Sequence, residues 1–255
     1  MLELDPNQID LWFVFFDDIQ DEHLLEQYRR LLTEEEQHRQ QRFYFPKDQR
    51  RYLITRALVR TVLSRYAPIA PKEWTFSTNA YGKPEIANDS NIARKLSFNV
   101  SHTQSLIVLG ITYGRNLGVD TENIRIRKAP LEIARHFFSP AEAEALYALP
   151  LDMQHDRFYQ YWTLKEAYIK ARGMGLSIPL DQFSFRLQGA DIQLSIDSRL
   201  NDEASRWRFW QFGLSAGYLT AICAEVSGNS NLRLRLRKIV PLGDEEGLEC
   251  VPVCY

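Results

Sequence analysis

Two short segments of the chain carry acidic and basic residues at spacings that could do chemistry. In one segment, a helix would place Trp162, Glu166 and Lys170 on one face, because they follow one another at intervals of four. In the other, a strand would turn Asp120 and Glu122 to the same side, because side chains alternate along a strand. If the two elements meet, three carboxylates converge beside an ammonium. Such oxygen ligands suit a hard divalent cation together with a substrate phosphate.

Each segment also has a plainer interpretation. A D-x-E pair is often a solvated strand end, and a Glu–Lys pair four residues apart is often a helix-surface pair worth a few tenths of a kcal/mol. The apolar residues before Asp120 indicate a buried strand, where two like charges need a cation to persist. Trp162 and Ile169 leave the helix little polar surface. Lys165 is expected to point toward the rim of the site or a phosphate.

Further polar residues sit where the chain should turn. Ser101, His102 and Thr103 lie between two apolar runs, so they are expected at a polar turn where all three could meet a phosphate. Gly82 and Pro84 predict a turn from which Lys83 projects. A basic stretch follows the first short helix and could equally be a solvated helix face. Its members are Arg39, Arg42, Lys47, Arg50, Arg51, Arg56 and Arg60.

The bulk composition bounds the class of protein. The chain has 255 residues, 45% of them hydrophobic and 25% charged, as in a soluble globular protein with a substantial core. Its net charge of −2 argues against a general nucleic-acid binder. The apolar run 11–16 is too short to span a bilayer and reads as a buried first strand. Three cysteines without a CxxC spacing indicate neither a disulfide framework nor a zinc site, so we expect a reduced, cytoplasmic protein.

The chain repeats one pattern twice. Thr33 and Ser139 each precede a helix with a glutamate three residues later, Glu36 or Glu142, which predicts a capping box in each half. A longer helix follows in each half, over 52–66 and over 161–171, and then a strand-like segment. Each half ends in an apolar hairpin, 96–100 with 106–112 and 207–212 with 218–226.

This pattern predicts an α+β fold of two similar subdomains, each a sheet plus helices, related by pseudo-two-fold symmetry. We place the subdomains at 1–114 and 115–255, packed face to face with the site in the crevice between them. Residues 227–231 read as a loop, and 232–240 alternate basic and apolar residues like an edge strand. The last residues look irregular.

In combination, the motifs carry a family resemblance. Over residues 1–226 the chain resembles a 4′-phosphopantetheinyl transferase of the larger, pseudo-dimeric type. The smaller holo-acyl-carrier-protein synthase type is a poorer match, because its chains hold one unit and trimerise. The resemblance rests on five motifs in family order: YGKP at 81–84, FNVSH at 98–102, GVDTE at 118–122, FFS at 137–139 and WTLKEAYIK at 162–170.

The resemblance implies the chemistry of the site. Members of the family transfer the phosphopantetheine arm of coenzyme A to a serine of an apo acyl or peptidyl carrier protein, releasing adenosine 3′,5′-bisphosphate. Asp120, Glu122 and Glu166 would then hold Mg²⁺ against the diphosphate. Lys170 would lie beside the phosphate that becomes the leaving group, aided by Lys165. The base that deprotonates the serine would be Glu166, directly or through water, or water alone, and the sequence does not decide among these.

The resemblance also implies how coenzyme A is held. Arg51, Lys83, Ser101 and His102 would contact the 3′-phosphate and adenine side, with Arg39 near the nucleotide. The chain departs from the family pattern at Glu36, where a lysine is often found, so one nucleotide contact is missing or comes from elsewhere. Thr121, between the two acids, should face away from them. For the carrier protein, we predict a docking patch made of Arg125, Arg127 and Lys128 with Ile124 and Ile126.

Two other functions compete with transfer. A Mg²⁺-dependent hydrolase that cleaves the pyrophosphate of a nucleotide cofactor would use the same carboxylates but water as nucleophile. A non-catalytic module that binds carrier protein or coenzyme A would not need three carboxylates and Lys170 together. The larger family type encloses its site in one chain, so we expect a monomer. The sequence leaves open whether the carrier serves fatty-acid, polyketide or nonribosomal-peptide synthesis, and whether acyl-coenzyme A is accepted.

Overall fold

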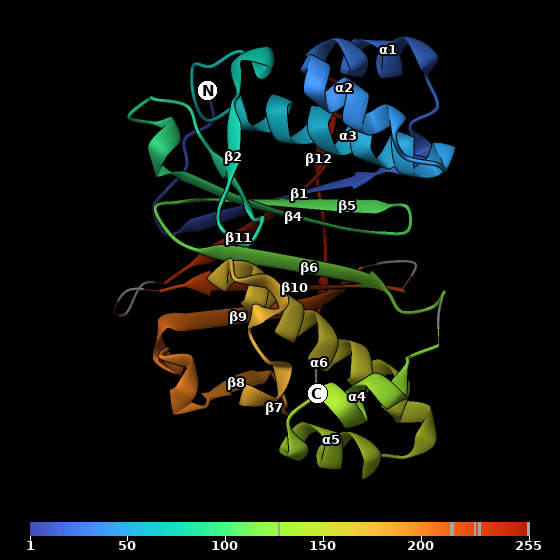
Figure 1. Cartoon of the computed structure of the whole chain (residues 1–255), viewed down its shortest axis with the longest axis vertical. Helices are drawn as coiled ribbons and strands as arrows, with labels where there is room; N and C mark the ends of the chain where they lie inside the picture. Colours follow the sequence, from blue (N-terminus) through green and yellow to red (C-terminus); the bar gives the residue numbers. More distant parts are fainter. Residues whose placement is uncertain (127, 215–216, 227, 229–230, 254–255) are drawn as a thin grey trace.

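Two β-sheets pack face to face, and each carries its helices on its outer side (Figure 1). The computed structural model describes residues 1–126, 128–214, 217–226, 228 and 231–253. The first sheet has the strand order β12-β11-β1-β5-β4 and the second the order β13-β9-β10-β6. The first sheet is formed by β1 (Gln8–Phe15), β4 (Leu96–Thr103), β5 (Leu106–Tyr113), β11 (Arg233–Ile239) and β12 (Glu245–Gly247). The second is formed by β6 (Leu117–Asn123), β9 (Trp207–Leu214), β10 (Tyr218–Glu225) and β13 (Val251–Pro252).

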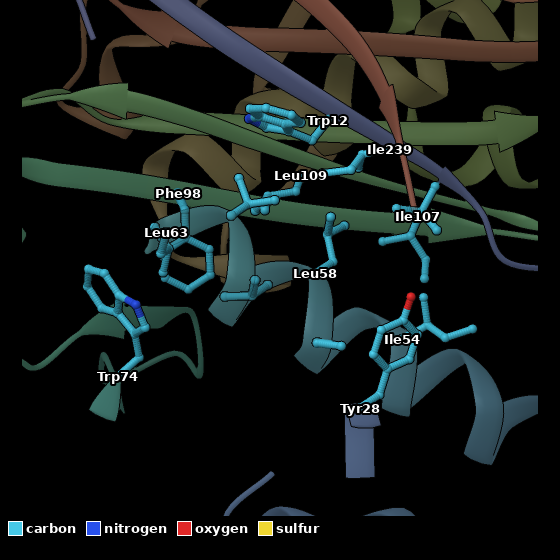
Figure 2. Close-up of a cluster of buried hydrophobic side chains, with 14 of the residues drawn as sticks. Trp12, Tyr28, Ile54, Leu58, Leu63, Trp74, Phe98, Ile107, Leu109 and Ile239 are labelled. Atoms are coloured by element: carbon cyan, nitrogen blue, oxygen red, sulfur yellow. The ribbon is translucent and has the colours of Figure 1, made fainter. Parts of the chain in front are cut away.

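The first sheet is covered by α1 (Glu22–Leu31), α2 (Glu34–Gln41) and α3 (Pro46–Leu63). Thr33 closes the predicted capping box with Glu36 at the start of α2. Helix α3 begins earlier than the sequence predicted, because Pro46 at its first turn needs no amide partner. Its apolar face and β1, β4 and β5 enclose one core, in which Leu58 and Trp12 are fully buried (Figure 2).

The second sheet is covered by α4 (Leu131–Phe137), α5 (Pro140–Tyr147) and α6 (Leu151–Arg172). Ser139 closes the second capping box with Glu142. Helix α6 also begins earlier than predicted, directly after Pro150, and ends at Gly173, whose φ of 68° is the left-handed conformation of many helix C-termini. The face of α6 toward the sheet forms a second core with the inner residues of β10.

A third apolar core lies between the two sheets. It joins residues of β1 and β5 to residues of β6, β9 and β10. Strand β1 is therefore buried on both faces, as its continuous apolar run predicted. Two small hairpins lie outside the sheets, β2 (Phe76–Thr78) with β3 (Pro84–Ile86), and β7 (Phe183–Gln188) with β8 (Asp191–Ile196). The predicted turn at 81–84 joins β2 to β3, with Gly82 at φ 86°.

The α+β class is confirmed, as are both apolar hairpins, β4–β5 and β9–β10. The division at residue 114 and the pseudo-two-fold relation of the halves stay predictions. Among the described residues, no helix is long and apolar enough to cross a membrane. Cys223 and Cys250 are free thiols, and Cys254 lies outside the described residues.

The tail was predicted wrongly. We assigned everything after 226 to the second half, but β11 pairs in parallel with β1 of the first sheet, and β12 pairs with β11. β11 is therefore flanked on both sides and is not an edge strand. The tail also contains the short strands β12 and β13, where the sequence looked irregular. Of the predicted loop at 227–231, residues 227, 229 and 230 lie outside the described part of the chain.

Candidate active site

Helix α6 lies directly against β6, and this contact places the helix face beside the acidic strand. A Cβ atom at Gly118 would collide with the backbone carbonyl of Ala167 and the amide of Ala171, so only glycine permits the approach. Asp120 follows two residues later on the same side of β6, and Lys170 lies on the facing surface of α6. The close packing therefore brings the two predicted segments together.

Lys170 is the centre of the polar cluster at this contact. Its ammonium lies 2.6 Å from Asp120 Oδ1 and donates hydrogen bonds to Ser101 Oγ (3.0 Å) and to the carbonyl of Val119 (3.2 Å). The Ser101 hydroxyl also donates to Asp120 Oδ1 at 3.1 Å. Ser101 comes from β4 of the first sheet, so this cluster joins both halves of the chain.

The three predicted carboxylates act on one another electrostatically. Burial, then the charge of Asp120 and more weakly that of Glu122, together raise the pKa of Glu166 to about 7, against the lowering effect of Lys170. Burial and then Asp120 raise the pKa of Glu122, while hydrogen bonds from Thr103 and Trp162 lower it. Trp162, Glu166 and Lys170 therefore share one face of α6, as their spacing predicted.

The donor set suits a hard cation, although its side chains do not form a closed cage. Asp120 Oδ2 is buried without a hydrogen-bond partner, which is costly for a carboxylate oxygen unless a ligand satisfies it. Burial is the main cause of the raised pKa values of Glu122 and Glu166, and the charge of Asp120 adds to it; a bound cation would oppose both effects. In the part of the chain that the structure describes, no three His, Cys, Asp or Glu side chains already stand in metal-binding geometry. The carboxylates fit a Mg²⁺ that also takes oxygens from a substrate and from water.

A cavity of about 900 Å³ extends from this cluster into the first half of the chain. Of the residues predicted to hold coenzyme A, it is lined by Arg39, Arg51, Ser101 and His102. Arg51 is paired with Asp48 at 2.9 Å. Burial lowers the pKa of His102, and the charge of Arg51 lowers it further, which favours the neutral imidazole. Asp120, Glu122 and Lys170 line the other end of the same cavity.

The cavity contains an ion-pair group that we did not predict. Glu36 pairs with Arg56 and with Arg60, and Arg56 lies 4.5 Å from the centre of the Phe76 ring. Arg60 also donates to the carbonyls of Pro71 and Trp74, so it is held on every side. Where the family often has a lysine, Glu36 therefore places a carboxylate in the cavity, and Arg56 forms an ion pair with it. A helical spacing of four between Arg56 and Arg60 was the only available signal.

Lys165 was predicted wrongly. Its side chain is fully buried and lies 2.8 Å from Glu142 Oε2, on the side of α6 away from the cavity. The ammonium also donates to the carbonyls of Leu180 and Phe183, each at 2.7 Å. Burial lowers the pKa of Lys165, and the carboxylate of Glu142 opposes that effect. This lysine stabilises the second core and does not reach a phosphate.

The prediction for Lys83 is wrong in the same way. Its side chain turns back between β6 and the end of α6, where it donates to the carbonyls of Leu117 (3.1 Å) and Ala171 (3.3 Å). Burial lowers its pKa. The neighbouring Pro84 lines the cavity, but Lys83 does not. The lysine of the YGKP motif thus ties the first half of the chain to the second.

Ser101 and His102 were expected at a turn, but both lie within strand β4. Thr121 faces away from the acids, and its hydroxyl lies 3.0 Å from that of Thr220 on β10. Of the predicted docking patch, Arg125, Ile126 and Lys128 are exposed next to the end of β6, and Arg127 lies outside the described residues. Thr103, expected at the same turn, lies at the end of β4 and contacts Glu122, and Asn99 of β4, which was not predicted, contacts β6.

Comparisons with known proteins identify the family of the chain. Residues 116–223 match the model of the 4′-phosphopantetheinyl transferase superfamily, and residues 20–112 match that of the N-terminal part of a 4′-phosphopantetheinyl transferase. The chain is 36% identical to the 4′-phosphopantetheinyl transferase Sfp of Bacillus subtilis over 78% of this chain and 84% of that one. It is 36% identical to the 4′-phosphopantetheinyl transferase HetI of a Nostoc species over 69% and 73%, respectively. A further relative, 4′-phosphopantetheinyl transferase gsp of Aneurinibacillus migulanus, is 29% identical over 89% and 90%.

Proposed function

The chain belongs to the 4′-phosphopantetheinyl transferase superfamily, and on that premise we propose that it transfers 4′-phosphopantetheine from coenzyme A to a serine of an apo carrier protein. The observation that carries the proposal is the cluster of Lys170, Asp120 and Ser101 at one end of a cavity built from both halves. The three relatives are all named as transferases, so the hydrolase alternative finds no support.

The metal in this proposal is Mg²⁺, held by Asp120, Glu122 and Glu166. It would supply charge neutralisation for the diphosphate of coenzyme A. The unpartnered Asp120 Oδ2 and the raised pKa values of Glu122 and Glu166 support this assignment. Lys170 keeps Asp120 in place and presents a positive charge to the phosphate that becomes the leaving group.

The serine of the carrier must lose a proton, and Glu166 is our candidate base. The pKa of Glu166, about 7 in the metal-free protein, would fall when Mg²⁺ binds beside it, so the side chain would be an ionised carboxylate able to accept a proton. It would take the proton directly or through a water molecule. The alternative is a water molecule acting without Glu166, and a near-normal rate in the Glu166→Gln variant would favour it.

Coenzyme A would lie in the cavity with its nucleotide toward the first half. Arg39 and Arg51 offer guanidinium groups suited to phosphate, and Ser101 and His102 line the same cavity. Arg56 supplies a further cation where the family often has a lysine three residues before Arg39. Lys83 has no part in this binding.

Mass spectrometry of apo carrier proteins after incubation with the chain, coenzyme A and Mg²⁺ tests the proposal. We expect one phosphopantetheine group on the carrier serine and adenosine 3′,5′-bisphosphate in solution. Cleavage of coenzyme A without a carrier would instead support the hydrolase. Glu166→Gln should lower the rate at least ~100-fold, the scale of a positioned acid–base group. A near-normal rate in that variant would leave water as the base.

The carrier protein is proposed to dock beside the end of β6, where Arg125 and Lys128 are exposed next to Ile126. Exchange of both basic residues for glutamate should raise KM for the carrier by about tenfold, because each reversal replaces attraction with repulsion for an acidic partner. KM for coenzyme A should stay unchanged in steady-state kinetics. An unchanged carrier KM would remove this patch. A monomeric state and a cytoplasmic location complete the proposal.

A further inference from the structure

The edges of the two sheets meet through side chains. β4 is the last strand of the first sheet and β6 the last strand of the second, and they do not pair as neighbours in one sheet. Three alternate residues of β4 contact β6 instead. Asn99 Oδ1 accepts from the amide of Val119 (2.8 Å), Ser101 donates to Asp120 (3.1 Å), and Thr103 contacts Glu122 and Asn123.

These contacts give hydrogen-bond partners to backbone groups on the free edge of β6, which would otherwise be unpaired. On this edge of β6, the amide of Val119 donates to the side chain of Asn99, and the amide of Asn123 donates to the hydroxyl of Thr103. The same row of β4 side chains reaches Asp120 and Glu122. The strand that carries the acids is therefore held in register by polar side chains of the other half of the chain.

Thr103 uses its hydroxyl in both directions. Its oxygen accepts from the amide of Asn123 at 3.2 Å, and its proton is donated to Glu122 Oε2 at 3.3 Å. The hydroxyl is thus fixed by the backbone on one side and fixes the carboxylate on the other. A second donor to Glu122, the indole of Trp162, comes from α6.

We propose that Thr103 is a positioning residue that orients the Glu122 carboxylate for the metal. The inference rests on the proposed function in one respect, that Glu122 is a ligand of Mg²⁺. Partners that hold a metal-binding carboxylate typically contribute about 10- to 100-fold in metal affinity when they are lost. Thr103 is not among the residues that line the cavity, so it would act through Glu122.

The test is a titration of the full chain with Mn²⁺ in the presence of coenzyme A, followed by electron paramagnetic resonance of the free ion. Thr103→Val keeps the shape of the side chain but removes both hydrogen bonds, so its Kd for Mn²⁺ should rise by about 10- to 100-fold. Thr103→Ser keeps the hydroxyl and should restore the affinity of the wild type. Thr220→Val is the matched control, because it removes a buried hydroxyl contact on the other face of β6.

Thr220→Val should bind Mn²⁺ like the wild type, and thermal unfolding checks that each variant is folded. A folded Thr103→Val protein with unchanged Mn²⁺ affinity would overturn the proposal. Equal weakening in Thr220→Val, or failure of Thr103→Ser to restore binding, would also overturn it, because the effect would then be a general loosening of β6. Absence of Mn²⁺ binding by the wild type would instead overturn the metal assignment itself.

Discussion

Two lysines of helix α6, five positions apart, each lie beside a buried carboxylate, yet their surroundings differ. Lys165 lies 2.8 Å from Glu142, and Lys170 lies 2.6 Å from Asp120. Lys165 is 0% exposed, whereas the side chain of Lys170 is 28% exposed and borders the cavity. Glu142 is further bound by Ser139 and by the amide of Phe185, so both of its oxygens are occupied.

Asp120, in contrast, keeps one buried oxygen without a partner. A buried ion pair whose donors and acceptors are all used contributes to the fold and has nothing left to offer a ligand. A pair with a free oxygen at a cavity is incomplete in the protein alone and is completed by something that binds. The two lysines therefore differ less in their distance from the carboxylate than in whether both carboxylate oxygens have hydrogen-bond partners. Those of Glu142 beside Lys165 do, and one of Asp120 beside Lys170 does not.

The largest expected effect is on stability, at the structural lysine. Lys165→Met should destabilise the protein by about 3–5 kcal/mol, because it leaves Glu142 buried without a counter-charge. Urea denaturation measures the loss, and the double variant with Glu142→Gln should recover part of it. The folded fraction should keep its turnover number. A turnover number that falls with normal stability would return Lys165 to the active site and break the comparison.

Lys170→Met should affect activity more than stability. Removal of a charge that stabilises the transferring phosphate should lower turnover by about 100-fold or more. The cost in stability should be smaller than for Lys165→Met, because solvent reaches this site. Transfer kinetics with a carrier protein and urea denaturation of the same sample give both quantities. Similar stability losses in the two variants would show that the two pairs do not differ as described.

The acidic cluster should make stability depend on pH. The folded pKa of Glu166, about 7, lies above its usual value of 4.5, so the folded protein binds more protons between these values. Stability of the metal-free protein should therefore fall by about 1–3 kcal/mol as pH rises through this window. Glu166→Gln should remove that fall, so it unfolds at a higher temperature than the wild type at pH 8 but not at pH 4.5. An equal difference at both pH values would contradict this assignment.

The smallest expected effect concerns Lys83. Lys83→Met leaves the carbonyls of Leu117 and Ala171 without their donor, which should cost about 1–3 kcal/mol. KM for coenzyme A should not change, because the ammonium does not line the cavity. Thermal unfolding and steady-state kinetics measure the two effects. A clear rise in KM for coenzyme A would reinstate the contact that the sequence predicted.

The sequence predicted the parts of the site that depend on local periodicity. Alternation along β6 put Asp120 and Glu122 on one side, and helical spacing put Glu166 and Lys170 on one face; these placements agree with the structure, while the roles of the residues stay predictions. Lys165 was misjudged because its partner, Glu142, lies on another helix and no local pattern connects them.

Contacts between distant segments account for the other errors as well. Lys83 reaches backbone carbonyls of β6 and α6, and backbone acceptors leave no trace in side-chain patterns. The alternation of basic and apolar residues in β11 correctly indicated a strand but could not identify β1 as its neighbour. The row formed by Asn99 and Thr103 beside Ser101 was visible as a period of two, and its polar face would have pointed to a contact with another element.

The parallel pairing of β11 with β1 sets the order in which the molecule can be completed during synthesis. β1 is made first, but its neighbour β11 emerges from the ribosome only after β6, β9 and β10 of the second sheet. Domains generally fold as units from the N-terminus as the chain grows. Until β11 has been made, the backbone groups of β1 on that edge of the N-terminal sheet have no pairing partner. Nascent chains halted before β11 should therefore depend on chaperones more than the finished protein does.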